Sequence, residues 1–204
     1  MQITGTYLTI VAGSASENMP STINEAPEYH VGEKIPMIAL KITNVKQFMS
    51  KFLAGDDFDS FLLEAASIST YNTFTIDGRQ NRAFYTTEEW DDPEIRPYEF
   101  TAWKKIRPVC FDLIKGKHTP AAFHFVLHLI PEYTAAIFQN EDTAVSPDQV
   151  KAFVLNIKYD GAGLTLVTGT AFHTFLMDKA PDILWDKAVK QFLSKKEISF
   201  EVLE

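Results

Sequence analysis

The chain has 204 residues, of which 46% are hydrophobic and 23% charged, and its formal net charge is −8. This composition suits one globular domain and argues against general nucleic-acid binding, since phosphate contacts need clustered cations. No apolar run approaches the roughly 20 residues of a membrane helix. The single Cys110 excludes an internal disulfide and any multi-cysteine metal site. We therefore expect a cytoplasmic protein that does not enter the membrane.

Residues 1–36 differ from the rest of the chain. They hold one short apolar stretch followed by a polar loop, and they lack the basic start of a secretory signal. A strand pattern begins at Met37, directly after Pro36. We interpret residues 1–36 as a leader or upstream extension, with one added strand as the alternative. Residues 37–204 then form the folding unit.

The first half of this unit, residues 37–116, is predicted to contain strand, helix, strands and a second helix. Asn44 is a good cap for the first helix. Pro108 is expected to break the second helix or to begin a new piece of it. Residues 86–99 read as a solvated loop that Trp90 anchors. The predicted elements are a strand at 38–42, a helix at 44–54, strands at 61–66, 73–76 and 82–85, and a helix at 100–114.

The second half, residues 122–193, repeats this order, and a last strand follows at 199–203. We predict an α+β fold built from an internally duplicated unit, with helices on one side of the sheets. Phe61 and Phe153 then occupy equivalent core positions. Asp77-Gly78 and Asp160-Gly161 have the composition of hairpin turns. The predicted elements are strands at 123–129, 153–157, 164–168 and 172–176, a helix at 132–139, and a helix at 181–193 with Ile183, Leu184, Ala188, Phe192 and Leu193 inward.

Residues with catalytic or ligating side chains form no recognisable motif. On a strand, His124 and His128 lie roughly 13 Å apart, too far to share one ion, so both are expected to face solvent. Cys110 lies on the apolar stripe of a helix and is expected to act as a small buried hydrophobe. The acidic triplet Asp56, Asp57 and Asp59 is interpreted as a solvated loop. We expect no metal and no cofactor.

Lysine and arginine concentrate on the predicted helices, whereas acidic residues concentrate in loops. If the helices share one side of the sheets, that side is locally basic despite the net charge. The alternative is the ordinary solvated side of amphipathic helices. The candidate binding residues are Lys46, Lys51, Lys104, Lys105, Lys187 and Lys190.

Residues 37–204 resemble a bacterial family of unknown function, found mainly in anaerobic Gram-positive bacteria. Three segments carry the resemblance, the second being the most specific. The family implies no activity, so it assigns no functional residue. The segments are Met37-Ile-Ala-Leu-Lys-Ile-Thr-Asn-Val-Lys46, Tyr71-Asn-Thr-Phe-Thr-Ile-Asp-Gly78, and Phe153-Val-Leu-Asn-Ile157 with Gly169.

The repeated element order, with Val154–Thr170 at its centre, is also similar in architecture to one domain of a DNA sliding clamp. That resemblance implies basic helices on one face. The leading hypothesis is a non-enzymatic protein that binds a protein or nucleic-acid partner through a clamp-like domain. One alternative is an enzyme whose residues converge from distant segments, such as Asn72, His173 and Asp178. The other is a small-ligand-binding domain that uses the Phe-rich interior.

Overall fold

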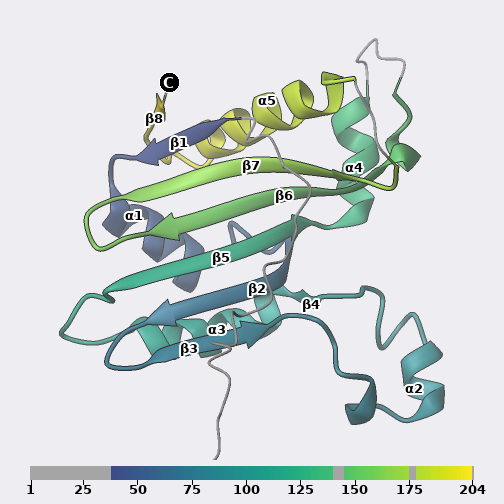
Figure 1. Ribbon diagram of the computed structural model, residues 1–204, viewed down its shortest axis with the longest axis horizontal. Coiled ribbons are helices and arrows are strands. Elements are labelled where there is room, and N and C mark those ends of the chain that lie inside the picture. The colour runs from purple at the N-terminus through teal and green to yellow at the C-terminus, as the bar shows by residue number, and fades with distance from the viewer. Residues whose placement is uncertain (1–37, 140–144, 175–177, 204) are drawn as a thin grey trace, which may run out of the picture. The chain divides into compact units, whose positions relative to one another are not determined.

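The computed structural model describes residues 38–139, 145–174 and 178–203 (Figure 1). The predicted α+β class is confirmed: within the described residues, eight antiparallel strands form one sheet, accompanied by five α-helices. The predictions for residues 1–36, including a folding unit that begins at Met37, lie outside the described residues. The strands are β1 (Ala39–Ile42), β2 (Phe61–Ser69), β3 (Thr73–Asp77), β4 (Thr101–Ala102), β5 (Ala122–Leu129), β6 (Val150–Tyr159), β7 (Leu164–Phe172) and β8 (Phe200–Leu203).

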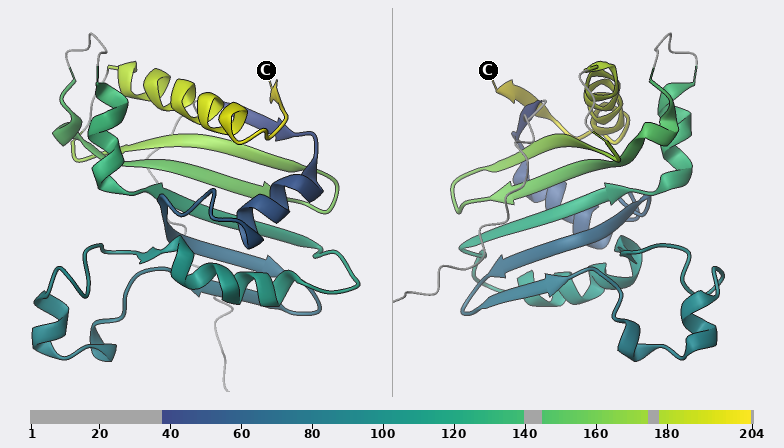
Figure 2. Two further views of the ribbon diagram at one scale, coloured as in Figure 1. Left: turned by 180° about the vertical axis from the view of Figure 1, so that it is seen from behind. Right: turned by 45° about the vertical axis from the view of Figure 1, so that its right-hand side comes forward.

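The strand order is β3-β2-β5-β6-β7-β1-β8, and the short β4 pairs with β2. The helical segments connect these strands. Figure 2 (left) shows α1, α3 and α5 in front of the same face of the sheet, which they cover together. They are α1 (Val45–Met49), which continues as the π-helix η1 (Ser50–Ala54), the 3₁₀-helix η2 (Arg82–Phe84), α2 (Thr87–Asp91), α3 (Trp103–Ile114), α4 (Pro131–Phe138), the 3₁₀-helix η3 (Pro147–Gln149) and α5 (Ala180–Lys195).

The core lies between the sheet and these helices. Residues 123, 125, 127 and 129 of β5 are buried, whereas the residues between them are more exposed, so one face of the strand points toward the helices. Phe52 of η1 stacks on Trp103 of α3 with ring centroids 4.4 Å apart, and Phe125 of β5 contacts both rings. The Phe-rich composition therefore forms a core of contacting aromatic rings.

The sheet does not show the predicted internal duplication. The two halves share an element order, but their strands pair differently: β5 lies between β2 and β6, whereas β1 lies between β7 and β8. Hydrophobic periodicity indicates which residues of a strand are buried, but it does not indicate which strands are neighbours in the sheet. The sequence pattern therefore suggested a repeat that the strand pairing does not show. Phe61 and Phe153 are both buried, as predicted, at 2% and 0% exposure.

Several local predictions are confirmed. The side chain of Asn44 accepts a hydrogen bond from the backbone N–H of Gln47 and caps α1. Pro131 occupies the first turn of α4, where its missing N–H is not needed. Gly161 turns the chain between β6 and β7 with a φ of 89°, a left-handed conformation that favours glycine. Trp90 is an anchor as predicted, since the guanidinium of Arg96 lies 3.6 Å from its ring centroid. The segment 86–99 is not a plain loop, however, because Thr86 caps the short helix α2, which carries Trp90.

Other local predictions are wrong. The segment predicted as a strand at 82–85 forms η2 instead, because it lies in an excursion between β3 and β4 that pairs with no strand of the described sheet. Gly78 makes no hairpin turn. It packs against the backbone of β2, where an added Cβ would lie 1.8 Å from the carbonyl oxygen of Leu63. Pro108 lies inside an unbroken α3, on its exposed side, where the carbonyl group left without an N–H partner can meet water.

The predicted strand at 172–176 is also corrected. Phe172 is the last residue of β7, and residues 175–177 lie outside the described part. In α5, Ile183 is 65% exposed and does not point inward, whereas Trp185 is buried.

Candidate functional site

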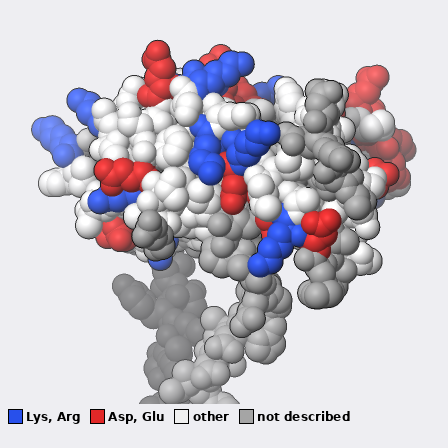
Figure 3. Space-filling view, turned by 90° about the horizontal axis from the view of Figure 1, so that it is seen from above, with Lys and Arg blue, Asp and Glu red and all other residues white. Residues whose placement is uncertain are grey.

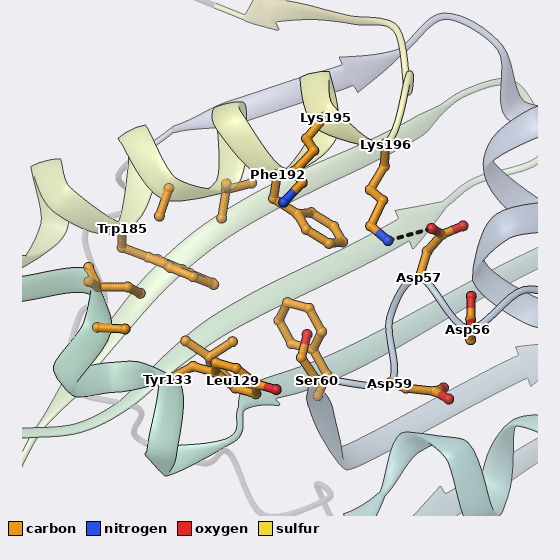
Figure 4. A pocket seen from close by; sticks show the side chains of 15 residues that line it. Asp56, Asp57, Asp59, Ser60, Leu129, Tyr133, Trp185, Phe192, Lys195 and Lys196 are labelled. Atoms are coloured by element: carbon orange, nitrogen blue, oxygen red, sulfur yellow. Dashed lines mark ion pairs between the residues drawn. The ribbon is translucent and has the colours of Figure 1, made fainter.

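A cavity of about 630 Å³ opens between α4, α5 and the loop that leads into β2. Figure 4 shows its lining from close by: α5 forms one wall, α4 forms the opposite wall, and the loop closes one end. Three stretches that are distant in sequence, residues 56–61, 129–137 and 185–196, therefore supply it. The lining residues are Asp56, Asp57, Asp59, Ser60, Phe61, Leu129, Tyr133, Ala136, Ile137, Trp185, Ala188, Val189, Phe192, Lys195 and Lys196.

The floor of the cavity is aromatic and aliphatic. Phe61 begins β2 and pairs in register with Leu129 at the end of β5. The ring of Phe61 lies 6.4 Å from that of Trp185 and 6.1 Å from that of Phe192. Strand pairing and helix packing together hold these side chains in place, so the floor is preformed.

The wall contributed by α4 follows from helical spacing. Tyr133, Ala136 and Ile137 lie at positions i, i+3 and i+4, which share one face of a helix. Ala136 leaves room in this wall because its side chain is a single methyl group, and its neighbour Ala135 does not line the cavity. Of these two adjacent alanines, only Ala136 lines the cavity, so a bulky substitution at Ala135 can serve as the control for the same substitution at Ala136.

Charged side chains gather at the loop end of the cavity. Lys196, just after α5, pairs with Asp57 at 2.8 Å, and this hydrogen bond raises the pKa of the lysine above its ordinary value. Asp59 pairs with Arg107 of α3. Two carboxylates of the acidic triplet are therefore neutralised by cations, so the prediction of a plain solvated loop is wrong for Asp57 and Asp59.

Two charged groups at this end have no ion pair among the described residues: Lys195 and Asp56. In Figure 4, the side chain of Lys195 points from the end of α5 toward Phe192, and Lys195 is one of the residues that line the cavity. Asp56 lies on the far side of Asp57 as seen from Trp185. The cavity thus combines an apolar interior with one available cation near its apolar floor.

This arrangement can hold a molecule that has an apolar body and a polar end. Ligand pockets of about 300–1,000 Å³ are mostly apolar, with a few polar groups that orient the ligand. The described lining holds no histidine and no cysteine. Within the described residues, no group of three His, Cys, Asp or Glu side chains could hold a metal ion.

The lysines predicted as a binding face are spread over α1, η1, α3 and α5. These helices do lie on one side of the sheet, but acidic residues lie among them, including Asp112 of α3 and Asp186 of α5. Figure 3 shows basic and acidic side chains interspersed on the face seen from above. A basic binding surface formed by Lys46, Lys51, Lys104, Lys105, Lys187 and Lys190 stays a prediction.

The residues suggested for an enzyme do not converge. Asn72 lies in the turn between β2 and β3, at the end of the sheet where β7 starts. His173 follows the other end of β7, and the carboxylate of Asp178 accepts a hydrogen bond from the backbone N–H of Ala180. Register places Asn72 and His173 at opposite ends of the sheet, so they cannot act on one substrate.

The other singled-out residues have structural partners. His124 is exposed, as predicted, but the side chain of His128 is only 13% exposed. It bonds the carboxylate of Glu64, and its ring centroid lies 4.9 Å from that of Phe100. Cys110 is buried, and desolvation raises its pKa to about 12, so its thiol stays protonated. This confirms its role as a small hydrophobe.

Sequence reasoning missed the cavity itself. Helical spacing of apolar residues on two segments, Tyr133 with Ile137 and Trp185 with Phe192, was a usable signal. It did not show that the two faces meet around a gap, because that depends on how α4 and α5 are placed by the strands between them.

A family profile described as a family of unknown function (DUF5721) matches residues 51–201. The match begins later than the resemblance expected from the sequence, which started at Met37. No curated protein and no solved structure matches the chain. The architectural similarity to a sliding clamp domain therefore has no structural neighbour in support. None of the helices in the described ranges is long and apolar enough to cross a membrane.

Proposed function

The chain belongs to this family of unknown function, and we propose that it binds a small amphipathic molecule in the cavity between α4 and α5. Of the alternatives that the sequence left open, a small-ligand-binding domain fits this geometry best. The observation that carries the proposal is the cavity of about 630 Å³ with an apolar floor and charged groups at one end.

Binding without chemical conversion is favoured by the state of the polar groups. Asp57 and Asp59 are held in ion pairs with Lys196 and Arg107, so neither is free to act as a base. The indole N–H of Trp185 donates a hydrogen bond to the backbone carbonyl oxygen of Val154 in β6. Among the described lining residues, neither the hydroxyl of Ser60 nor that of Tyr133 makes a hydrogen bond to a base, as covalent catalysis would need.

Burial of the ligand's apolar part supplies the affinity. Removing apolar surface from water contributes about 25 cal/mol per Å² before the costs of association are subtracted. Phe61, Trp185 and Phe192 are held by strand pairing and helix packing, so little ordering is needed on binding. We therefore expect saturable binding of single-chain alkyl molecules.

Calorimetric titration with decanol, kept below its solubility limit in water, tests the proposal. Ala136→Phe places a ring in the cavity, and Ala135→Phe makes the same change on the neighbouring residue of α4, outside the lining. The wild type and Ala135→Phe should bind decanol with equal affinity, whereas Ala136→Phe should not bind it. Ala188→Phe, on the opposite wall, should block binding as well.

Melting temperatures show whether each variant is folded. Equal binding by Ala135→Phe and a folded Ala136→Phe would place the ligand elsewhere and refute this site. Absence of saturable binding by the wild type would refute the proposed function.

A further inference from the structure

We propose that the ligand is an aliphatic carboxylate whose head group pairs with Lys195 while its tail lies on the floor formed by Phe61, Trp185 and Phe192. This inference rests on the proposed function and names the class of molecule that the same cavity takes. It follows from the distribution of charge around the cavity.

The charges at the loop end largely cancel in pairs. Asp57 is matched by Lys196 at 2.8 Å, and Asp59 by Arg107. A ligand charge near these pairs therefore meets little net field. Two groups remain outside these ion pairs: the ammonium of Lys195 and the carboxylate of Asp56, whose charge also acts on Lys196. The positions of Lys195 and Asp56 therefore decide the sign of the ligand.

Lys195 is the better placed of the two. It belongs to the last turn of α5, one turn after the floor residue Phe192; it lines the cavity, and its nitrogen ends beside Phe192 in Figure 4. Asp56 comes from the loop after η1 and lies beyond the Asp57–Lys196 pair as seen from the floor. A head group attached to a tail on the floor thus reaches Lys195 before it reaches Asp56.

Carboxylate chemistry suits this single cation. Lysine presents a compact charge with rotatable donors, so one ammonium can pair with one carboxylate. A dianionic phosphate would call for more than the one available cation, since the other two cations here already hold carboxylates. The geometry therefore points to a monoanionic head on an apolar chain.

The test compares three ligands with the same tail: decanoate, decanol and decylammonium. Exposed ion pairs contribute modestly, so the wild type should bind decanoate up to about five-fold more tightly than decanol. Decylammonium should bind more weakly than decanol. Raising the salt concentration should narrow the preference for decanoate, because the pair is screened.

Lys195→Gln should remove the preference for decanoate and leave the affinity for decanol unchanged. Lys105→Gln makes the same change of charge on α3, outside the cavity, and should keep the preference. Lys195→Gln that retained the wild-type preference would overturn the inference. The inference would also be overturned if the wild type bound decylammonium more tightly than decanol and Asp56→Asn abolished this preference. In both cases decanol binding would still support the proposed function, whereas a wild type that binds none of the three ligands would refute both.

Discussion

The indole nitrogen of Trp185 donates a hydrogen bond of 2.8 Å to the backbone carbonyl oxygen of Val154. Its ring also stacks on Phe153, with centroids 5.1 Å apart. One side chain therefore joins α5 to β6 and at the same time lines the cavity. The wall formed by α5 is held at a fixed place above the sheet, which a preformed pocket requires.

Trp185→Phe should lower the free energy of unfolding by about 1–3 kcal/mol, because the carbonyl group of Val154 loses its donor inside the protein. Urea denaturation measures the change. Trp90→Phe is the matched control, since Trp90 lies on α2 in the excursion and its indole N–H donates no hydrogen bond within the described residues. The cost of this change should stay below about 1 kcal/mol. Equal costs for the two variants would contradict the structural role of the Trp185–Val154 bond.

Gly78→Ala should destabilise the protein by roughly 2–3 kcal/mol, since the new methyl group would overlap the carbonyl of Leu63 and force two backbones apart. Gly116→Ala is the control, because nothing lies within 4 Å of a Cβ at that position. Its effect should fall within about 0.5 kcal/mol. If both variants unfold at the same urea concentration, the close packing of Gly78 on β2 is wrong.

Asn44→Ala should cost on the order of 1 kcal/mol, because the N–H of Gln47 loses the side-chain acceptor that caps α1. Asn72→Ala, in the exposed turn between β2 and β3, should change stability by less than half as much. Thermal or urea unfolding distinguishes the two. No measurable loss for Asn44→Ala would mean that the cap contributes nothing in solution.

Much of the fold could be predicted from local patterns. Alternation along β5, the Asn44 cap and the proline at the start of α4 each depend on neighbours in sequence, and each is confirmed. The wrong predictions concern residues whose conformation depends on segments that are distant in sequence. Gly78 has a turn composition but serves a close approach to Leu63, and the segment at 82–85 has a strand composition but no strand beside it.

The candidate site was less predictable. Lysine positions on helices can be read from sequence, but the pairing of Asp57 with Lys196 joins residues that the fold alone brings together. Ile183 and Trp185 are close in sequence, and only packing against Phe153 shows that Trp185 is the buried one. A cavity formed by three stretches of sequence follows from their placement and not from any one of them.

The pH dependence of stability should carry a signature of Asp186. Burial raises the pKa of this carboxyl group, opposed by the hydrogen bond from Thr168 at 2.6 Å and by Lys190. The folded state therefore binds the proton more tightly than the unfolded state. Asp186 contributes stability below its unfolded pKa, and this contribution is lost as pH rises through the raised folded pKa. Burial acts in the same direction on the pKa of Asp182.

Asp186→Asn should therefore gain stability relative to the wild type as the pH rises between about 3 and 7, while keeping an acceptor for Thr168. Asp160→Asn provides a control of opposite sign. Backbone N–H groups of Gly163 and Ala162 lower the pKa of Asp160, so the wild-type residue stabilises the fold above its unfolded pKa. Urea unfolding across this pH range gives the stability of each variant relative to the wild type. This difference should rise with pH for Asp186→Asn and fall for Asp160→Asn. If both differences changed with pH in the same way, the opposite pKa shifts of Asp186 and Asp160 would be contradicted.

Alanine methyl groups on both walls of the cavity allow the central claim to be tested directly. In a two-dimensional NMR spectrum of protein with isotope-labelled alanine methyl groups, decanoate should shift the signals of Ala136 and Ala188. Both signals should saturate with one dissociation constant, and the signal of Ala135 should move far less. Shifts that do not saturate, or that fall on alanines away from α4 and α5, would contradict a ligand site between these helices.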